Sequence, residues 1–168
     1  MAAISGLVKS GTGLPSTWTA GAAGSHYVEV IVDLADAVTS KGSALAQGDT
    51  IQAIAVPAGS QVLFAGFQVM TAMTGTSTDT TIDFGVTGGD VDCWVDGFDL
   101  DGAAAGAYAP AATAAITPAQ TFFSAADTLD LLIATQTNTI TGGRLRVFAH
   151  ILDCSSKDAE VGIALVGS

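Results

Sequence analysis

Apolar and polar residues alternate along several short stretches of this chain, and a period of two residues predicts β-strands. The clearest alternation covers residues 26–34, HYVEVIVDL, where three valines and Leu34 face one way while Tyr27 and Glu29 face the other. The same period predicts a last strand over residues 144–152, RLRVFAHIL, with inward-facing residues at Leu145, Val147, Ala149 and Ile151.

The middle of the chain carries a dense strand-and-turn signal. Ile82, Phe84 and Val86 alternate with polar or small residues, which indicates a half-buried strand. Residues 87–90, TGGD, predict a tight turn, because glycine adopts positive φ without strain. Residues 91–96 alternate again and predict a short return strand.

Residues 61–73, QVLFAGFQVMTAM, are apolar on both faces of the strand that they predict. One face carries Leu63, Phe67 and Val69, and the other carries Val62, Phe64 and Met70. A strand that is apolar on both sides is central in its sheet or lies under a partner. Gly66 in its middle indicates a bulge or a bend.

Loops and less regular stretches separate these strands. Residues 35–49 predict a loop with one helical turn at residues 43–46, and residues 135–143 predict another loop. Residues 103–115 are low in complexity, and a short strand is expected near residues 114–117.

About eight short strands without a βαβ pattern predict an all-β fold. The expected architecture is a single antiparallel β-sandwich or jelly roll with extended N- and C-terminal arms. Further strands lie at residues 50–56 and 128–134. The predicted organisation is an N-terminal arm, a sandwich domain and a C-terminal arm, at residues 1–25, 26–154 and 155–168.

Charge and composition exclude several classes of partner. The 168 residues carry a formal net charge of −11, which is the opposite of the basic footprint that nucleic acids and anionic membranes require. No apolar run reaches the roughly 18 residues of a transmembrane helix. Only 12% of the residues are charged, against about a quarter in an average domain. Either partners cover much of the surface, or Thr, Ser and Gly compose it.

The run of aspartates between residues 90 and 101 is the candidate metal site. An EF-hand loop needs glycine at its sixth position and glutamate at its twelfth. If Gly102 is the sixth residue, the twelfth is Tyr108, so the pattern fails. Another oxygen cage stays open, and the alternative is that these acids cap turns. We expect no metal and no cofactor.

No catalytic motif occurs, and we expect no catalytic residue. His26 and His150 are the two histidines, and His150 lies among apolar residues that predict a structural role. Cys93 and Cys154 are expected to be reduced and buried. Trp94 either covers a second surface or anchors a partner.

Four segments carry a resemblance to a known family: residues 44–51 (ALAQGDTI), 56–62 (VPAGSQV), 83–97 (DFGVTGGD through WVDG) and 126–130 (ADTLD). They resemble small virion proteins of tailed phages, found as head decoration (cement) proteins or minor structural proteins. The resemblance covers about residues 26–153.

This resemblance implies a non-enzymatic protein, often of jelly-roll fold, that is made in the host cytoplasm and binds the outer surface of the phage head. Its implied partners are the major capsid protein and further copies of itself, as a homotrimer. An alternative is a receptor- or glycan-binding module of a phage fibre or tail. For that role the aromatic candidates are Trp18, Tyr27, Trp94 and Tyr108.

The arms carry apolar residues that one domain's core cannot all accommodate, so we expect them to contact neighbouring subunits or the major capsid protein. Ordering an arm costs about 1–2 kcal/mol per residue in backbone entropy, so main-chain hydrogen bonds to a neighbour would have to contribute. The candidate partner contacts are Leu7, Leu14, Trp18, Trp94, Ile163 and Leu165.

Overall fold

A computed structural model describes residues 3–4, 25–109 and 122–154 of the chain. The described part contains ten strands and one helix. In chain order they are β1 (Ala3–Ile4), β2 (Ser25–Asp33), α1 (Leu34–Lys41), β3 (Thr50–Val56), β4 (Ser60–Gly75), β5 (Thr81–Gly85), β6 (Val95–Asp99), β7 (Tyr108–Ala109), β8 (Phe122–Phe123), β9 (Asp127–Thr135) and β10 (Ile140–Asp153).

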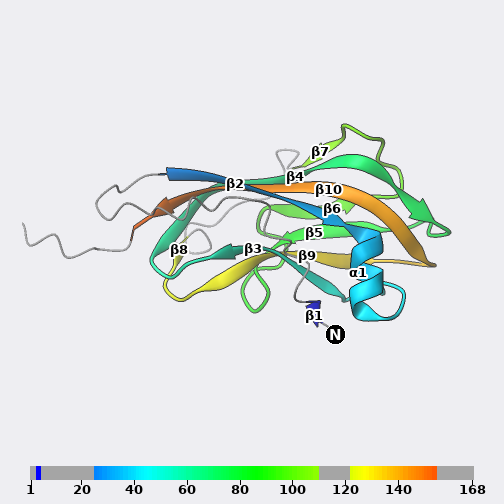
Figure 1. Cartoon of the computed structure of the whole chain (residues 1–168), viewed down its shortest axis with the longest axis horizontal. Coiled ribbons are helices and arrows are strands. Elements are labelled where there is room, and N and C mark those ends of the chain that lie inside the picture. Colours follow the sequence, from blue (N-terminus) through cyan, green and yellow to red (C-terminus); the bar gives the residue numbers. More distant parts are fainter. Residues whose placement is uncertain (1–2, 5–24, 110–121, 155–168) are drawn as a thin grey trace, which may run out of the picture.

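The strands form two sheets that lie one above the other (Figure 1). One sheet has the order β1-β3-β9-β5-β6, and the other has the order β2-β10-β4-β7, with β8 paired to β4. All pairs are antiparallel except β1 with β3. The predicted all-β antiparallel sandwich is therefore confirmed.

Eight of the ten described strands form four pairs that are nested along the chain. β2 pairs with β10, β3 with β9, β4 with β7 and β5 with β6, so the first half of the chain folds back along the second half. A long antiparallel ribbon of this kind, wrapped so that successive pairs fall into alternate sheets, has the pairing of a jelly roll.

The core between the sheets follows the predicted alternation. On β10, Leu145, Val147, Ala149 and Ile151 are all at most 3% exposed. Val30 and Val32 of β2 are buried with them, while Tyr27 and Glu29 on the same strand are exposed. The inward positions of the first and last strands were thus predicted correctly, because the period of two fixes them.

Helix α1 corrects the sequence prediction, which ended a strand at Leu34 and expected a loop from residue 35. Asp33 accepts a hydrogen bond from the Ala35 N–H (2.9 Å) as the N-cap, and Gly42 ends the helix with φ 74°. Leu34 and Ala37 are fully buried. The helix lies at one end of the sandwich, beside the two sheets (Figure 1). Its caps are clear in the sequence, but its eight residues are too few to show a helical period.

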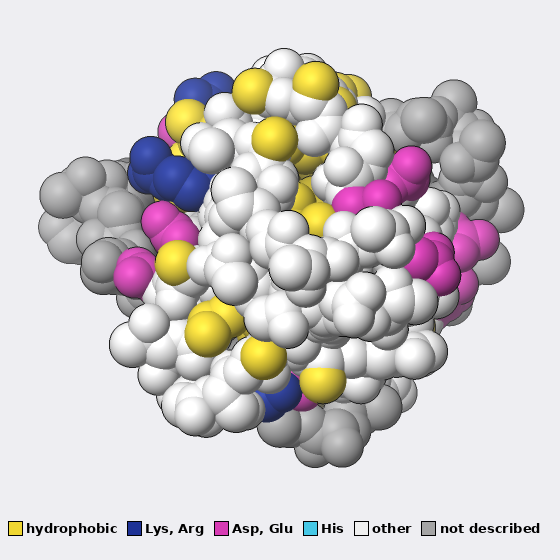
Figure 2. Space-filling view, turned by 90° about the vertical axis from the view of Figure 1, so that its right-hand side faces the viewer, with side chains coloured by type: hydrophobic (Ala, Val, Ile, Leu, Met, Phe, Trp, Pro, Cys, Tyr) yellow, Lys and Arg dark blue, Asp and Glu magenta, His cyan; other side chains and the backbone are white. Residues whose placement is uncertain are grey.

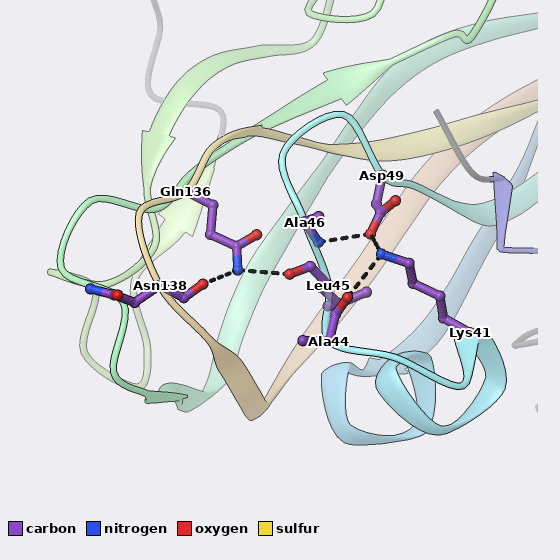
Figure 3. Close-up of polar contacts among 7 residues, drawn as sticks. All are labelled: Lys41, Ala44, Leu45, Ala46, Asp49, Gln136 and Asn138. Atoms are coloured by element: carbon purple, nitrogen blue, oxygen red, sulfur yellow. Dashed lines mark hydrogen bonds and ion pairs between the residues drawn. The ribbon is translucent and has the colours of Figure 1, made fainter.

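Side chains and main chain lock the loop after α1 to the loop between β9 and β10 (Figure 3). Lys41 forms an ion pair with Asp49, whose carboxylate also accepts from the Ala46 N–H (2.7 Å). The Gln136 amide donates to the Leu45 carbonyl (2.7 Å). These bonds hold Leu45 in the core at 1% exposure. Residues 44–51, the first segment that resembles phage proteins, therefore connect α1 to the loop between β9 and β10.

A bulge in β4 changes the faces predicted for residues 61–73. The register with β10 shifts between the pairs His150–Phe64 and Ile151–Val62, so Leu63 is the extra residue. Leu63 and Phe64 are both exposed, while Val62, Phe67 and Val69 are buried on the inner face. The prediction that Leu63 shares a face with Phe67 is wrong, because one extra residue inverts the alternation.

The predicted return strand at residues 91–96 is also wrong. Residues 86–94 form a compact loop, closed by the Val86 N–H to Asp90 carbonyl bond (2.8 Å), and β6 begins only at Val95. This loop crosses directly over Gly85, where a Cβ would overlap the main chain of Asp90 and Val91.

Two further boundaries differ from the sequence prediction. β10 begins at Ile140, so the loop expected at residues 135–143 is shorter. Ala3 and Ile4 within the predicted N-terminal arm form β1 and pair with Thr50 and Ile51 of β3. The strand expected near residues 114–117 and the C-terminal arm lie outside the described residues.

Candidate functional site

The outer face of the β2-β10-β4-β7 sheet gathers aromatic side chains from four strands. On β10, His150 is paired with Tyr27 of β2 and with Phe64 of β4. Phe148, two residues earlier, points to the same side of the sheet. Tyr108 comes from β7, where it is paired with Gln68 of β4. We call Tyr27, Phe64, Tyr108 and Phe148 the aromatic face.

Phe148 is the centre of the aromatic face. Its ring centroid lies 6.3 Å from that of Tyr27, 5.9 Å from that of Phe64 and 5.7 Å from that of Tyr108. All three rings lie within 25° of parallel to it. Phe148 is consequently 7% exposed although it points away from the core, while the three rings around it are 39% to 62% exposed.

Gly66 makes this arrangement possible on β4. It is paired directly with Phe148 and brings no side chain to the outer face. Tyr108 lies on β7, two strands away from β10, and neighbouring strands are about 4.8 Å apart. Its ring still approaches the ring of Phe148 to 5.7 Å, and Gly66 adds no side chain beside Phe148 on the outer face.

A hollow of about 460 Å³ lies over the aromatic face, and three polar side chains complete its lining. They are Gln68, Arg146 and His150. The Nε atom of Arg146 is buried and has no hydrogen-bond partner among the described residues. The hollow therefore combines an apolar floor with three polar side chains, which is the composition of small-molecule sites.

Tyr27 is tied to its own strand by a hydrogen bond. Its hydroxyl donates to the Glu29 carboxylate at 3.0 Å. Partial burial of the ring raises the pKa of Tyr27, and the bond to Glu29 raises it further. Tyr27 therefore stays a neutral phenol at neutral pH, with its hydroxyl oxygen free to accept a bond.

Figure 2 looks at the right-hand end of the molecule of Figure 1. Hydrophobic side chains gather at its top, on the side where Figure 1 shows β4 and β7, with Lys or Arg side chains beside them. The centre of this end is mostly uncharged polar side chains and main chain, and Asp and Glu lie toward its margins. The low charge of the chain is thus visible as a polar but uncharged surface on this end.

Of the predicted partner-contact residues, the structure describes Trp94 alone. Trp94 is 1% exposed, packed in the core between the sheets, so its expected role as a partner anchor is corrected: its side chain has no surface to offer. Leu7, Leu14, Trp18, Ile163 and Leu165 lie outside the described residues.

Tyr27 and Tyr108, which are 81 positions apart in the sequence, are brought to one hollow. They are the only two tyrosines of the chain. Sequence reasoning named both as exposed aromatics but missed Phe148 and Phe64. The even positions of β10 could have indicated Phe148, since they fall opposite to Val147 and Ala149. Phe64 was correctly placed on the face opposite Phe67, but the strand pattern did not show that this face is exposed.

The aspartate run does not assemble a cation site. Within residues 3–4, 25–109 and 122–154, no group of three or more His, Cys, Asp or Glu side chains could hold a metal ion. Asp99 and Asp101 instead accept from main-chain N–H groups of Gly102 (2.9 Å) and Thr80 (2.5 Å). A hydrogen bond to Asp90 raises the pKa of Asp92 to about 6, and burial contributes.

The two thiols occupy different environments. Cys93 is buried, and burial raises its pKa to about 12, whereas Cys154 is exposed. Both are free cysteines, so the expectation that Cys154 is buried is wrong while that for Cys93 is right. Among the described helices none is long and apolar enough to cross a membrane.

Comparison with known proteins gives structural neighbours only. No protein-family model matches the sequence, and no curated protein matches it. A chain in the capsid of Ralstonia phage GP4 is 16% identical, with 84% of this chain and 91% of that chain covered and a TM-score of 0.51. A chain in the capsid asymmetric unit of cyanophage Pam1 is 15% identical, with 83% and 99% covered and a TM-score of 0.47. At such identities the likeness concerns the fold.

Proposed function

We propose that this protein is a non-enzymatic structural protein of a phage virion, a decoration (cement) protein that binds the outer surface of the head and stabilises it. The observation that carries the proposal is the fold shared with a chain of the Ralstonia phage GP4 capsid over most of both chains. The four sequence segments that resemble phage head proteins support it independently. Assembly on a capsid also suits a surface with few charges.

The proposed partners are the major capsid protein and further copies of this chain. We assign the head contacts to residues 1–25 and 155–168, whose apolar side chains exceed what one sandwich core needs. The oligomer is proposed to be a homotrimer, by analogy with decoration proteins at local threefold positions. Multi-angle light scattering tests this number, and a stable monomer at micromolar concentration would contradict it.

The decisive experiment adds purified protein to phage heads that lack it. The expected result is saturable binding over the whole head and a higher temperature of head disruption. A variant that lacks residues 155–168 tests the role proposed for this segment, because it keeps all ten described strands. It should melt like the full chain in isolation and occupy fewer head sites. Absence of saturable binding by the full chain would exclude the proposal.

A receptor- or glycan-binding module of a fibre or tail is the second candidate. The observation that favours it is the meeting of Tyr27 and Tyr108 at one exposed hollow. Electron microscopy of virions that carry a labelled copy separates the two candidates. Label over the entire head supports a decoration protein, whereas label at the tail tip supports receptor binding.

A further inference from the structure

We propose that the hollow over the aromatic face is a carbohydrate-binding site, which takes a neutral saccharide against Tyr27 and Tyr108. The proposal rests on the second candidate function, the glycan-binding module, and gives it a ligand class; it does not depend on the decoration function. It would serve a protein on the head or on the tail equally.

The aromatic rings supply the apolar part of the site. A pyranose ring has an apolar face of C–H groups, and such a face is buried favourably against an aromatic side chain. Tyr27 is 62% exposed and Tyr108 is 49% exposed, so both have ring surface to offer. Both rings are held nearly parallel to Phe148 between them. The platform is thus formed before a ligand arrives, and little side-chain entropy is lost on binding.

The polar side chains supply the part that recognises hydroxyl groups. The Gln68 amide both donates and accepts, and the Arg146 guanidinium, which lines the hollow, only donates. His150 at the other end of the hollow adds a ring nitrogen. An apolar protein side chain would leave these groups unpaired, which costs free energy. Saccharide hydroxyl groups would satisfy them while the sugar ring covers the aromatic floor.

Charge around the hollow favours a neutral ligand over an acidic one. Arg146 contributes one positive charge, and the Glu29 carboxylate lies on the adjacent strand, bonded to Tyr27. The chain as a whole carries a net charge of −11, which repels polyanions. A neutral oligosaccharide meets neither penalty.

Another occupant of an exposed aromatic surface is a second copy of this chain. Interfaces between proteins are also rich in Tyr, Phe and Arg. The hollow, with its three polar side chains, distinguishes this surface from a flat apolar patch. Oligomeric state without sugar therefore belongs to the test.

The experiment applies the full-length protein to a printed array of neutral and acidic oligosaccharides. The strongest neutral ligand is then titrated by NMR with ¹³C-labelled tyrosine. Because Tyr27 and Tyr108 are the only tyrosines, every tyrosine signal reports on this site. We expect both ring signals to shift with saturation. Tyr108→Ala and Gln68→Ala should each weaken binding by about tenfold or more.

The controls separate a site from a folding effect. Phe122→Ala removes a side chain that is equally exposed, at 49%, but does not line this hollow, and it should bind like the wild type. Tyr27→Phe keeps the ring and should retain more binding than Tyr27→Ala. All variants should melt within a few degrees of the wild type, because the altered side chains are partly exposed.

Two results would overturn the proposal. One is that the array retains no neutral saccharide, or that Tyr108→Ala retains it as well as the wild type does. The other is that sedimentation velocity without sugar shows Tyr108→Ala converting an oligomer to a monomer while no sugar binds. The aromatic face would then be an interface between copies.

Discussion

Phe148 on β10 and Gly66 on β4 are directly paired across the outer sheet, and the missing side chain of Gly66 admits Tyr108 to the ring of Phe148 at 5.7 Å. We infer that this glycine bears on the contact of Tyr108 with Phe148, one of the three ring contacts that form the aromatic face. The sequence shows Gly66 as an interruption of an apolar strand, whereas in the fold it is the residue paired with Phe148, the centre of the aromatic face.

Gly66→Val should therefore disrupt the aromatic face. A valine side chain opposite Phe148 would separate Phe148 from Tyr108, since it occupies the outer face between them. Nuclear Overhauser contacts between the two rings should be lost, and those between Phe148 and Tyr27 should remain. Persistence of the Phe148–Tyr108 contacts would show that Gly66 is not what admits Tyr108.

Asp49→Ala should lower the free energy of unfolding by about 3 kcal/mol, because it leaves the Lys41 ammonium without its carboxylate in a largely buried site. Only 15% of the Lys41 side chain and 5% of the Asp49 side chain are exposed. The Ala46 N–H loses its acceptor as well. Urea unfolding followed by circular dichroism measures the change.

Arg144→Gln is the matched control for that ion pair. Arg144 and Asp33 are 3.8 Å apart, with side chains 50% and 36% exposed. Exposed pairs contribute little, so the expected loss is below about 1 kcal/mol. Equal losses in the two variants would contradict the role assigned to Asp49.

Gly85→Ala should destabilise the fold by about 3 kcal/mol, because the new methyl group would overlap the main chain of Asp90 and Val91. Gly88→Ala is the control in the same loop. Gly88 has φ 88° but nothing within 4 Å of a Cβ, so the cost is that of a left-handed alanine, about 1–2 kcal/mol. Thermal and urea unfolding of both variants should give this order, and the reverse order would contradict it.

Native protein should react with Ellman's reagent at one thiol of two. Cys154 is exposed, whereas burial protects Cys93 and raises its pKa to about 12. Only the thiolate is the nucleophile, so Cys93 should react only after unfolding. Peptide mapping of iodoacetamide-treated protein identifies the residue, and modification of Cys93 in the folded protein would be the contrary result.

Ionisation of Asp130 should cost stability as pH rises. Burial raises the pKa of Asp130, which is 2% exposed, above the ordinary carboxyl value of about 3.9. Between that value and the raised one, the unfolded chain has released the proton while the native chain still holds it. Native stability therefore falls through this window as pH increases and is constant above it.

The comparison with Asp130→Asn isolates that effect. The variant keeps an oxygen that can accept from the Thr87 N–H, as Asp130 does at 3.3 Å, but it does not ionise. The free energy of unfolding of the wild type minus that of Asp130→Asn should be smaller at pH 7 than at pH 3.5. Asp79→Asn, at an exposed position, should follow the wild type at both values. An unchanged difference between wild type and Asp130→Asn across this range would exclude the assignment.

The period of two residues determined much of this fold from sequence alone. It identified the inward positions of β2 and β10, the core strand at Ile82 and Phe84, and the all-β class, because burial of alternate side chains is a local property of an extended chain. It also placed the outward positions of β10, among them Arg146. Helix α1 was not predicted, because its eight residues hold too few turns to show a period.

Only the tertiary structure decided what lies over and beside those strands. The bulge at Leu63 changes the faces at the start of β4, and a register shift is a property of the pair of strands and not of either one. Trp94 is buried because the loop at residues 86–94 folds back over Gly85, a close approach that no spacing in the sequence encodes. The aromatic face depends on nested pairing that places β7 and β2 on either side of β4 and β10. Tyr27 and Tyr108, which are 81 positions apart, meet there because of the long-range strand order, which local patterns do not specify.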